Sequence, residues 1–257
     1  MMRDTEVKYH IQLSEDDLEG ARLAILTGDP GRVVEIAKYL NNPRKIGQNR
    51  EYTSYLGELE GQKILVISTG IGGPSTAICV EEIAMIGIKY LIRVGTSGGM
   101  RLDVEAGDIV IPTGSIRQEG TSREYLPIEF PAVPDFLVVS ALKEAVEMAG
   151  YKNHLGVVHC KDSFYGQHSP SRMPVSYELE NKWNAWIKAG CLCSEMETAA
   201  LFTISQTLGL HAGTVLLVIW NQEREKRGLD NKSDFDVEKE IKVAIEALRI
   251  LILKYHV

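Results

Sequence analysis

The sequence predicts an α/β domain in which helices cover a central β-sheet. Short apolar runs of strand length alternate with longer segments of helical character, and this alternation is typical of α/β sandwiches. Several apolar runs are nearly continuous, as expected for strands that are buried on both faces. With 257 residues and no internal repeat or low-complexity linker, the chain favours a single domain over residues 1–257.

The expected elements follow in chain order. Strands are expected at 23–26, 64–68, 90–94, 108–111, 155–159 and 214–220. Helices are expected from about Val33, where the first strand has ended, and at 73–87, 135–148, 196–208 and 237–253. In the last helix, Ile241, Ile245, Leu248 and Ile252 form one apolar stripe. The irregular stretches 117–134 and 165–174 are expected to be loops that serve a site.

Composition excludes several classes of protein. The net charge of -7 disfavours binding to nucleic acid or to an acidic membrane surface. No signal peptide is recognised, and the longest apolar run, 215–220, is too short to cross a membrane. The cysteines are expected to be buried reduced thiols, since their spacing is a poor zinc signal, and we expect a cytoplasmic protein. They are Cys79, Cys160, Cys191 and Cys193.

Two segments suggest a binding site for a small anion. The run Gly28-Asp29-Pro30-Gly31-Arg32 directly follows an apolar strand, so its glycines allow close backbone approach and the next helix offers N-terminal amides. An ordinary turn explains the same residues. The second segment, 93–99, places Arg93 at the end of an apolar strand, followed by Thr96, Ser97 and glycines. A buried arginine needs either a structural carboxylate or a bound anion, and both readings remain open.

A dinucleotide or a nucleoside triphosphate fits these segments less well. The junction at 68–75 has a misplaced third glycine, and Arg93 stands about 20 residues on, where a dinucleotide fold carries an acid. No Gly-Lys-Ser/Thr sequence follows a glycine-rich loop. The sequence therefore favours a small anion.

Taken in order, these and other segments resemble the nucleoside phosphorylase-I family over nearly the whole chain, and most closely its uridine-cleaving members. The matching segments are YHIQL (9–13), GDPGR (28–32), RE (50–51), STGIGGPS (68–75), RVGTSG (93–98), EFPAV (129–133), DSFYGQ (162–167) and EME (195–197). The resemblance implies a three-layer α/β/α sandwich with a central mixed β-sheet.

The resemblance also assigns phosphate and ribose contacts. It implies that phosphate is bound by Gly28, Arg32, Arg93 and Thr96, and by Arg50 of a neighbouring subunit. It implies that the same neighbour contributes His10 to the ribose, although the residues alone favour a surface role for His10. Shared sites imply a homodimer, and relatives usually assemble dimers into a hexamer.

Further ribose contacts are implied at the EME segment. By resemblance, Glu197 accepts the ribose hydroxyls and Met196 packs beneath the sugar. Glu195 is expected to orient the base or the site rather than to act as a nucleophile. The residues alone favour a solvated helix start for the two carboxylates.

The base pocket is implied at Phe164 and Gln167, which offer an aromatic face and an amide that complements the uracil edge. Most relatives carry arginine two residues after the glutamine, where this chain has Ser169. Arg172 is the expected substitute, with His168 as its competitor. The resemblance places two further apolar residues in the pocket, which are equally explained as core strand. These are Ile219 and Trp220.

The resemblance implies reversible phosphorolysis of uridine, with Arg93, Glu197, Gln167 and Arg172 as catalytic residues and with phosphate as co-substrate. No cofactor is expected and no metal is required, although a structural potassium ion is implied near Glu51, Ile71 and Ser75.

Three alternative functions remain. Purine nucleoside phosphorylases carry an aspartate where this chain has Asn221, which cannot donate a proton as an acid. A nucleosidase that uses water would leave three arginines without an anion. A catalytically silent nucleoside-binding protein of the same fold would be expected to lose the arginines or Glu197, which this chain retains.

Overall fold

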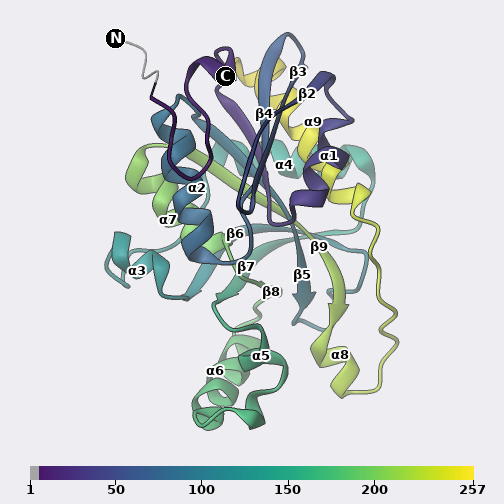
Figure 1. Ribbon diagram of the computed structural model, residues 1–257. Helices are drawn as coiled ribbons and strands as arrows, with labels where there is room; N and C mark the ends of the chain where they lie inside the picture. Colours follow the sequence, from purple (N-terminus) through teal and green to yellow (C-terminus); the bar gives the residue numbers. More distant parts are fainter. Residues whose placement is uncertain (1–5) are drawn as a thin grey trace.

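A computed structural model describes residues 6–257 and shows helices packed on both faces of one mixed sheet (Figure 1). The nine strands run in the order β2-β3-β4-β1-β5-β8-β7-β6-β9, and β9 pairs also with β5, so that the last five strands close into a ring. The strands are β1 (Leu23–Thr27), β2 (Asn41–Asn49), β3 (Tyr52–Leu59), β4 (Gln62–Ser68), β5 (Tyr90–Gly99), β6 (Ile109–Gln118), β7 (Asn153–Lys161), β8 (Cys193–Glu195) and β9 (His211–Asn221).

The helices form two outer layers. On one face α4 packs against α9, and on the other α2 packs against α7 (Figure 1). The helices are α1 (Pro30–Ala37), α2 (Gly73–Met85), α3 (Thr121–Tyr125), α4 (Phe136–Ala149), α5 (Phe164–His168), α6 (Ser176–Lys188), α7 (Thr198–Leu208), α8 (Gln222–Lys226) and α9 (Glu238–Tyr255), with short 3-10 helices at Asp16–Leu18 and Pro170–Arg172. None of these helices is both long and apolar enough to cross a membrane. The α/β prediction is confirmed.

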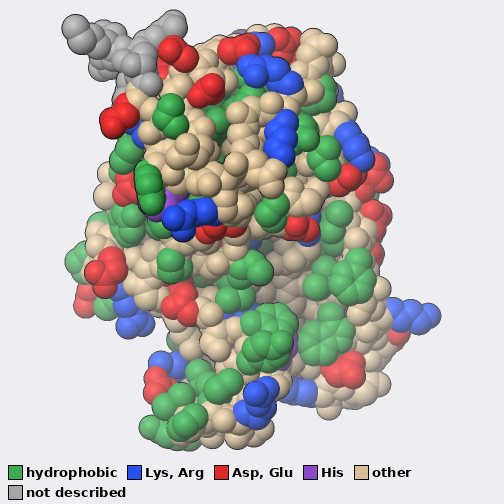
Figure 2. All heavy atoms as spheres, in the orientation of Figure 1, with side chains coloured by type: hydrophobic (Ala, Val, Ile, Leu, Met, Phe, Trp, Pro, Cys, Tyr) green, Lys and Arg blue, Asp and Glu red, His purple; other side chains and the backbone are tan. Residues whose placement is uncertain are grey.

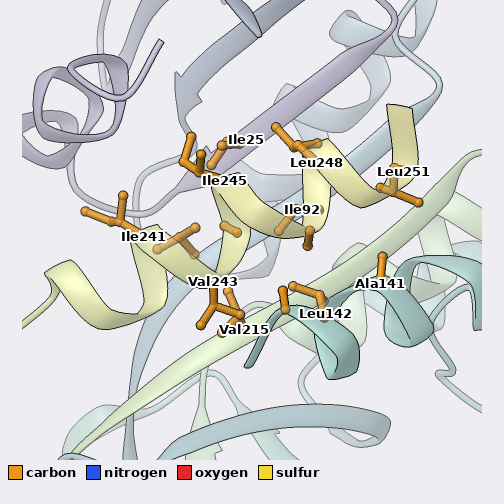
Figure 3. Close-up of a cluster of buried hydrophobic side chains, with 14 of the residues drawn as sticks. Ile25, Ile92, Ala141, Leu142, Val215, Ile241, Val243, Ile245, Leu248 and Leu251 are labelled. Atoms are coloured by element: carbon orange, nitrogen blue, oxygen red, sulfur yellow. The ribbon is translucent and has the colours of Figure 1, made fainter. Parts of the chain in front are cut away.

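The largest hydrophobic cluster lies between the sheet and the α4–α9 layer (Figure 3). The predicted stripe of α9 faces inward, with Ile241, Ile245 and Leu248 packed toward Ile25 and Ile92 of the central strands. Each such side chain contributes about 1.5–3 kcal/mol on full burial. This packing gives the site a rigid support, because β1 and β5 both continue into it.

The structure corrects several predicted boundaries. Strand β5 does not end at Val94: it pairs with β9 as far as Gly99, so Arg93 lies within the strand. Helix α1 begins at Pro30 rather than near Val33, because the Asp29 side chain accepts a hydrogen bond from the Gly31 N–H and caps the helix. The stretches expected to be loops contain α3 and most of α5 together with the second 3-10 helix.

Besides α3 and α5, strands β2, β3 and β8 and helices α6 and α8 were absent from the sequence prediction. Strand β2 reads NNPRKIGQN, and its side chains are exposed or half-buried, so it carries no apolar signal. Its register is set by pairing with β3, which is buried but interrupted by polar residues. Strand β8 has only three residues, too few for a recognisable pattern. Helix α6 is mostly polar, with Trp183 as its buried residue, so its apolar face is hard to recognise in the sequence.

One buried carboxyl makes the stability of the fold sensitive to pH. Burial raises the pKa of Glu240, at the start of α9, to about 8 from the ordinary 4.5, although the Arg32 charge opposes the shift. Because the folded state then holds a proton that the unfolded state releases, the free energy of unfolding should fall between pH 4.5 and about 8.

Glu240→Gln should remove this part of the pH dependence and should raise the melting temperature most at pH 8 and above. Thermal melts of both proteins at several pH values would check this. Parallel melting curves for the two proteins across the whole range would contradict it.

Candidate active site

A cavity of about 770 Å³ opens at the carboxyl ends of β1, β4, β5, β8 and β9. Figure 2 shows hydrophobic side chains gathered on both sides of the hollow between the α5–α6 region and the end of β9. Most of the residues that the sequence assigned to phosphate, ribose and base line this one cavity. They are Gly28, Arg32, Arg93, Thr96, Phe164, His168, Met196, Glu197, Ile219 and Trp220.

Arg93 is the buried cation at the centre of the cavity, with only 4% of its surface exposed. Its Nη2 donates to the Glu197 carboxylate, and its Nη1 lies 3.8 Å from the Glu195 carboxylate. Nε and Nη1 have no hydrogen-bond acceptor among residues 6–257. One side of the guanidinium therefore makes a structural ion pair, while two of its nitrogens lack an acceptor within the described residues.

Two glycines give the Arg93 guanidinium its space. A Cβ on Gly95 would lie 2.2 Å from Arg93 Nη1, which no side chain tolerates. A Cβ on Gly28 would lie 3.3 Å from the Gly70 carbonyl oxygen and 4.0 Å from Arg93 Nη2. The absence of a side chain at Gly95 thus lets the Arg93 guanidinium lie directly against the backbone of β5.

Arg32 adds a second cation to the same wall of the cavity. Burial lowers its pKa, and the nearby Arg93 charge lowers it further, while Glu240 and Asp29 act in the opposite direction. Two cations that face one cavity and repel each other favour a bound anion, since an anion between them relieves the repulsion. Thr96 lines this part of the cavity and brings a hydroxyl.

Glu197 stands on the other side of Arg93 and is 4% exposed. It accepts a hydrogen bond from the Gly72 N–H at 2.7 Å as well as from Arg93. Burial raises its pKa, and the Arg93 charge opposes this. The solvated helix start that the residues alone favoured is therefore wrong.

Glu195 has a structural role at the same turn. One of its carboxylate oxygens accepts the N–H groups of Glu197 and Thr198, each at 2.9 Å, and so holds the start of α7. This arrangement fixes the backbone on which Glu197 and Met196 stand. It agrees with the expectation that Glu195 orients the site.

An apolar end of the cavity lies beyond the carboxylates. Phe164, at the start of α5, packs its ring 4.3 Å from that of His168, centroid to centroid. Ile219 and Trp220 come from the end of β9, and both are half-buried and line the cavity, although Ile219 also packs on the main core.

Gln167 lies in an adjoining cavity of about 490 Å³, which shares Lys161 and His168 with the first. Its amide is held at both ends: Nε2 donates to Gln222 Oε1 at 3.0 Å, and Oε1 accepts from Ser194 Oγ at 2.7 Å. Ser194 also accepts a hydrogen bond from Lys161 Nζ at 2.9 Å. The glutamine is thus oriented before any ligand arrives.

Lys161 was missed from the sequence, although the signal was present. It stands at the end of a strand whose preceding residues are apolar or neutral, as Arg93 stands in β5. A charge in that position points to a site for the same reason in both strands.

Arg172 is not brought to either cavity. It is exposed in the second 3-10 helix, with its guanidinium carbon 6.0 Å from the centre of the Tyr165 ring. Arg172 stands at the end of a separate 3-10 helix, Pro170–Arg172, that follows α5 with its Gln167.

His10 and Arg50 lie together on the outside of the subunit rather than in its own cavity. The His10 ring meets Tyr9 edge-on at 4.8 Å, and Arg50 lies 6.0 Å from the Tyr9 ring. His10 Nδ1 is 2.6 Å from the Glu82 carboxylate, which also accepts the backbone N–H of His10. The contacts with Glu82 therefore fix the position of the imidazole.

The residues assigned to a potassium ion also meet. Glu51 and Ser75 both lie against Gly70: a Cβ placed on Gly70 would be 2.9 Å from Glu51 Cγ and 3.3 Å from Ser75 Oγ. Ser75 Oγ also donates a hydrogen bond to the Ile71 carbonyl at 3.2 Å. All the available donors are oxygen atoms, which suit a hard cation.

Asn221 has no part in the cavity. Its Nδ2 donates to the Arg101 and Val104 carbonyls at 2.9 and 2.7 Å, while its Oδ1 accepts two N–H groups and caps α8. The side chain that stands where purine-acting relatives carry an acid is thus fully engaged in structure.

Comparison with known proteins agrees with this geometry. The phosphorylase superfamily matches residues 22–255. A uridine phosphorylase of Treponema pallidum is 52% identical over 252 residues, which cover 98% of this chain and 97% of the relative. The uridine phosphorylase of Escherichia coli is 38% identical over 247 residues, which cover 95% of this chain and 98% of the relative. A guanosine phosphorylase of Halorubrum lacusprofundi is 35% identical over 249 residues, covering 94% and 98%. By these matches, which extend over nearly the whole fold, the chain belongs to the phosphorylase superfamily.

Proposed function

We propose that this chain catalyses the reversible phosphorolysis of uridine, giving uracil and ribose 1-phosphate. The observation that carries the proposal is the Arg93 guanidinium, which joins the Glu197 carboxylate while two of its buried nitrogens lack acceptors in the described structure. The uridine phosphorylases of two organisms, similar over nearly the full chain, support the choice of substrate.

The reaction follows from the order of groups along the cavity. Phosphate binds to Arg32, Arg93, Thr96 and the amide of Gly28, below the ribose. Glu197 accepts the sugar hydroxyls, and Met196 packs against the ring. As the glycosidic bond lengthens, positive charge develops on the ribose and negative charge on the base. The phosphate dianion is both nucleophile and countercharge, and Gln167 binds the departing base from a fixed orientation.

The site is proposed to be completed by a second subunit, within a dimer that assembles further into a hexamer. Arg50 and His10 support this, since they stand side by side on the surface and outside their own cavity. A potassium ion between Glu51, Ile71 and Ser75 would lie near the same contact. We expect no other cofactor, and we place the enzyme in cytoplasmic pyrimidine salvage.

Purine phosphorolysis is the second candidate, because a guanosine phosphorylase is also similar to this chain. The engagement of Asn221 by two carbonyls and two N–H groups argues against it, because no acid is left at that position to protonate a purine.

The absorbance change on cleavage of uridine, measured with and without phosphate, tests the proposal. Cleavage of uridine should require phosphate and should exceed that of guanosine or inosine by at least about tenfold. Cleavage without phosphate would show a nucleosidase, faster cleavage of guanosine would show a purine enzyme, and tight binding without turnover would show a silent binder.

A further inference from the structure

The His10 imidazole is bound by one carboxylate, Glu82, which no step of the mechanism above uses. Glu82 lies near the end of α2, and only 8% of its surface is exposed. Its Oε1 lies 2.6 Å from His10 Nδ1, and its Oε2 accepts the backbone N–H groups of His10 and Ile11 at 3.0 and 2.8 Å. Three polar contacts from two neighbouring residues therefore converge on this carboxylate, and Ile11 anchors them because it is fully buried.

The carboxylate also decides which nitrogen of the imidazole carries the hydrogen. A carboxylate can only accept hydrogen bonds, so His10 Nδ1 must donate to Glu82. In the neutral ring the hydrogen is then on Nδ1, and Nε2 is a hydrogen-bond acceptor. Glu82 thus gives the far side of the imidazole a fixed polarity, which suits a group that can donate a hydrogen bond.

His10 is also fixed relative to Arg50, the cation proposed to reach the phosphate of a neighbouring site. Asn49 Nδ2 donates to the His10 carbonyl oxygen at 2.7 Å, and Arg50 is the next residue along the chain. The Tyr9 ring contacts both, at 4.8 Å from the His10 ring and 6.0 Å from the Arg50 guanidinium carbon. This surface therefore presents a cation and a hydrogen-bond acceptor side by side. With Arg50 at the phosphate, His10 lies against the sugar that the phosphate attacks.

The sugar offers a hydrogen donor for this acceptor. In the proposed arrangement Glu197 accepts the hydroxyls at C2′ and C3′, so the hydroxyl at C5′ is the one that remains for His10. A hydroxyl can donate to the lone pair of a ring nitrogen. An ionised 5′-phosphate can only accept, so it would place one acceptor against another and leave both unpaired.

We propose that Glu82 is a positioning residue for substrate choice: it holds His10 of one subunit as the acceptor for the 5′-hydroxyl of a nucleoside bound by the partner subunit. The inference rests on the proposed phosphorolysis and its shared site, and it adds the origin of specificity at the 5′ end. A 5′ group that can donate is bound, and a nucleotide, whose 5′-phosphate can only accept, is rejected. His10 transfers no proton in this role and acts by binding alone.

The variant Glu82→Gln inverts this polarity while it keeps the backbone contacts. The Ile11 N–H can only donate, so the oxygen of the introduced amide must face it, and the amide nitrogen then turns to His10 Nδ1. Nδ1 becomes the acceptor of the ring and Nε2 becomes its donor. The matched control is Glu81→Gln, because Glu81 is the adjacent residue of α2 and accepts a hydrogen bond from the Tyr125 hydroxyl at 3.0 Å instead.

The test measures kcat/KM, with phosphate saturating, for three nucleosides that differ only at C5′. Uridine can donate and accept there, 5′-O-methyluridine can only accept, and 5′-amino-5′-deoxyuridine, as an ammonium, can only donate. The wild-type enzyme should prefer the amino substrate to the O-methyl substrate by at least about tenfold. In Glu82→Gln, kcat/KM should rise about tenfold for the O-methyl substrate, fall about tenfold for the amino substrate and change least for uridine. Glu81→Gln should keep the wild-type pattern.

The gain on 5′-O-methyluridine is decisive, because neither a distorted site nor the lost charge of Glu82 would produce it. Equal losses on all three substrates would overturn the inference and leave Glu82 a structural residue. If Glu82→Gln does not fold, His10→Phe decides, since it keeps an aromatic ring without nitrogens: a preference for the amino substrate that survives this change would also overturn the inference. A wild-type enzyme that cleaves uridine only without phosphate, or not at all, overturns the proposed function itself, so the two failures are distinguishable.

Discussion

Replacing Arg93 with alanine is expected to lower kcat/KM for phosphate by about 10³-fold, the upper end of the range for removal of one preorganised donor and the lower end for an arginine that binds phosphate. The effect should be this large because Arg93 serves two groups at once. Its Nη2 binds the Glu197 carboxylate, and its Nε and Nη1 are the buried donors left for the phosphate. Steady-state kinetics with phosphate varied at saturating uridine would measure it.

The same substitution should also destabilise the fold, because Glu197 is left buried without its cation. Loss of one partner of a buried pair costs about 3–5 kcal/mol. The double variant Arg93→Ala, Glu197→Gln should regain part of that stability but none of the activity, as shown by denaturant unfolding beside the kinetics. Arg249→Ala is the matched control, since Arg249 pairs with Glu60 and Glu246 on the surface and should leave both unchanged. Near-normal turnover of Arg93→Ala at saturating phosphate would refute the assignment.

The anion end of the site could be predicted because its signals are local. Gly28 and Arg32 follow one apolar strand directly, and Arg93 lies in another. A short segment therefore indicates both the strand and the anion-binding residues that belong to it. Even here the sequence ended β5 five residues early, because the glycines at 95, 98 and 99 read as a loop. Only the pairing with β9 shows that these glycines are in a strand, where Gly95 makes room for a guanidinium.

The base end could not be predicted because it depends on tertiary contacts. Ser194 links Lys161 to Gln167, but the three residues come from β8, β7 and α5. The separation of these three residues in the sequence does not predict that they are in contact. The substitute for the missing arginine was expected nearby in sequence, at Arg172, but the structure places Arg172 outside both cavities.

Two inactive variants, Arg50→Ala and Glu197→Gln, are expected to recover activity when their subunits are combined. The reason is the placement of Arg50, which is exposed beside Tyr9 and outside its own cavity, whereas Glu197 is buried within it. If each site takes Glu197 from one subunit and Arg50 from the other, a mixed dimer has one site with both residues intact and one that lacks both.

The expected recovery follows from counting sites. In an equal mixture that pairs at random, half of the dimers are mixed and each restores one of two sites, so about a quarter of wild-type activity should return. Co-expression with two different tags, followed by purification through both, removes assemblies made of one variant alone, so the purified assemblies should show at least about a quarter of wild-type activity. His10→Ala combined with Glu197→Gln should behave alike, whereas Arg93→Ala combined with Glu197→Gln should recover nothing, because both residues belong to the same subunit's cavity. Doubly tagged Arg50→Ala and Glu197→Gln dimers that stay inactive would place Arg50 outside the site, and the phosphate would then be bound by Arg32 and Arg93 of one chain alone.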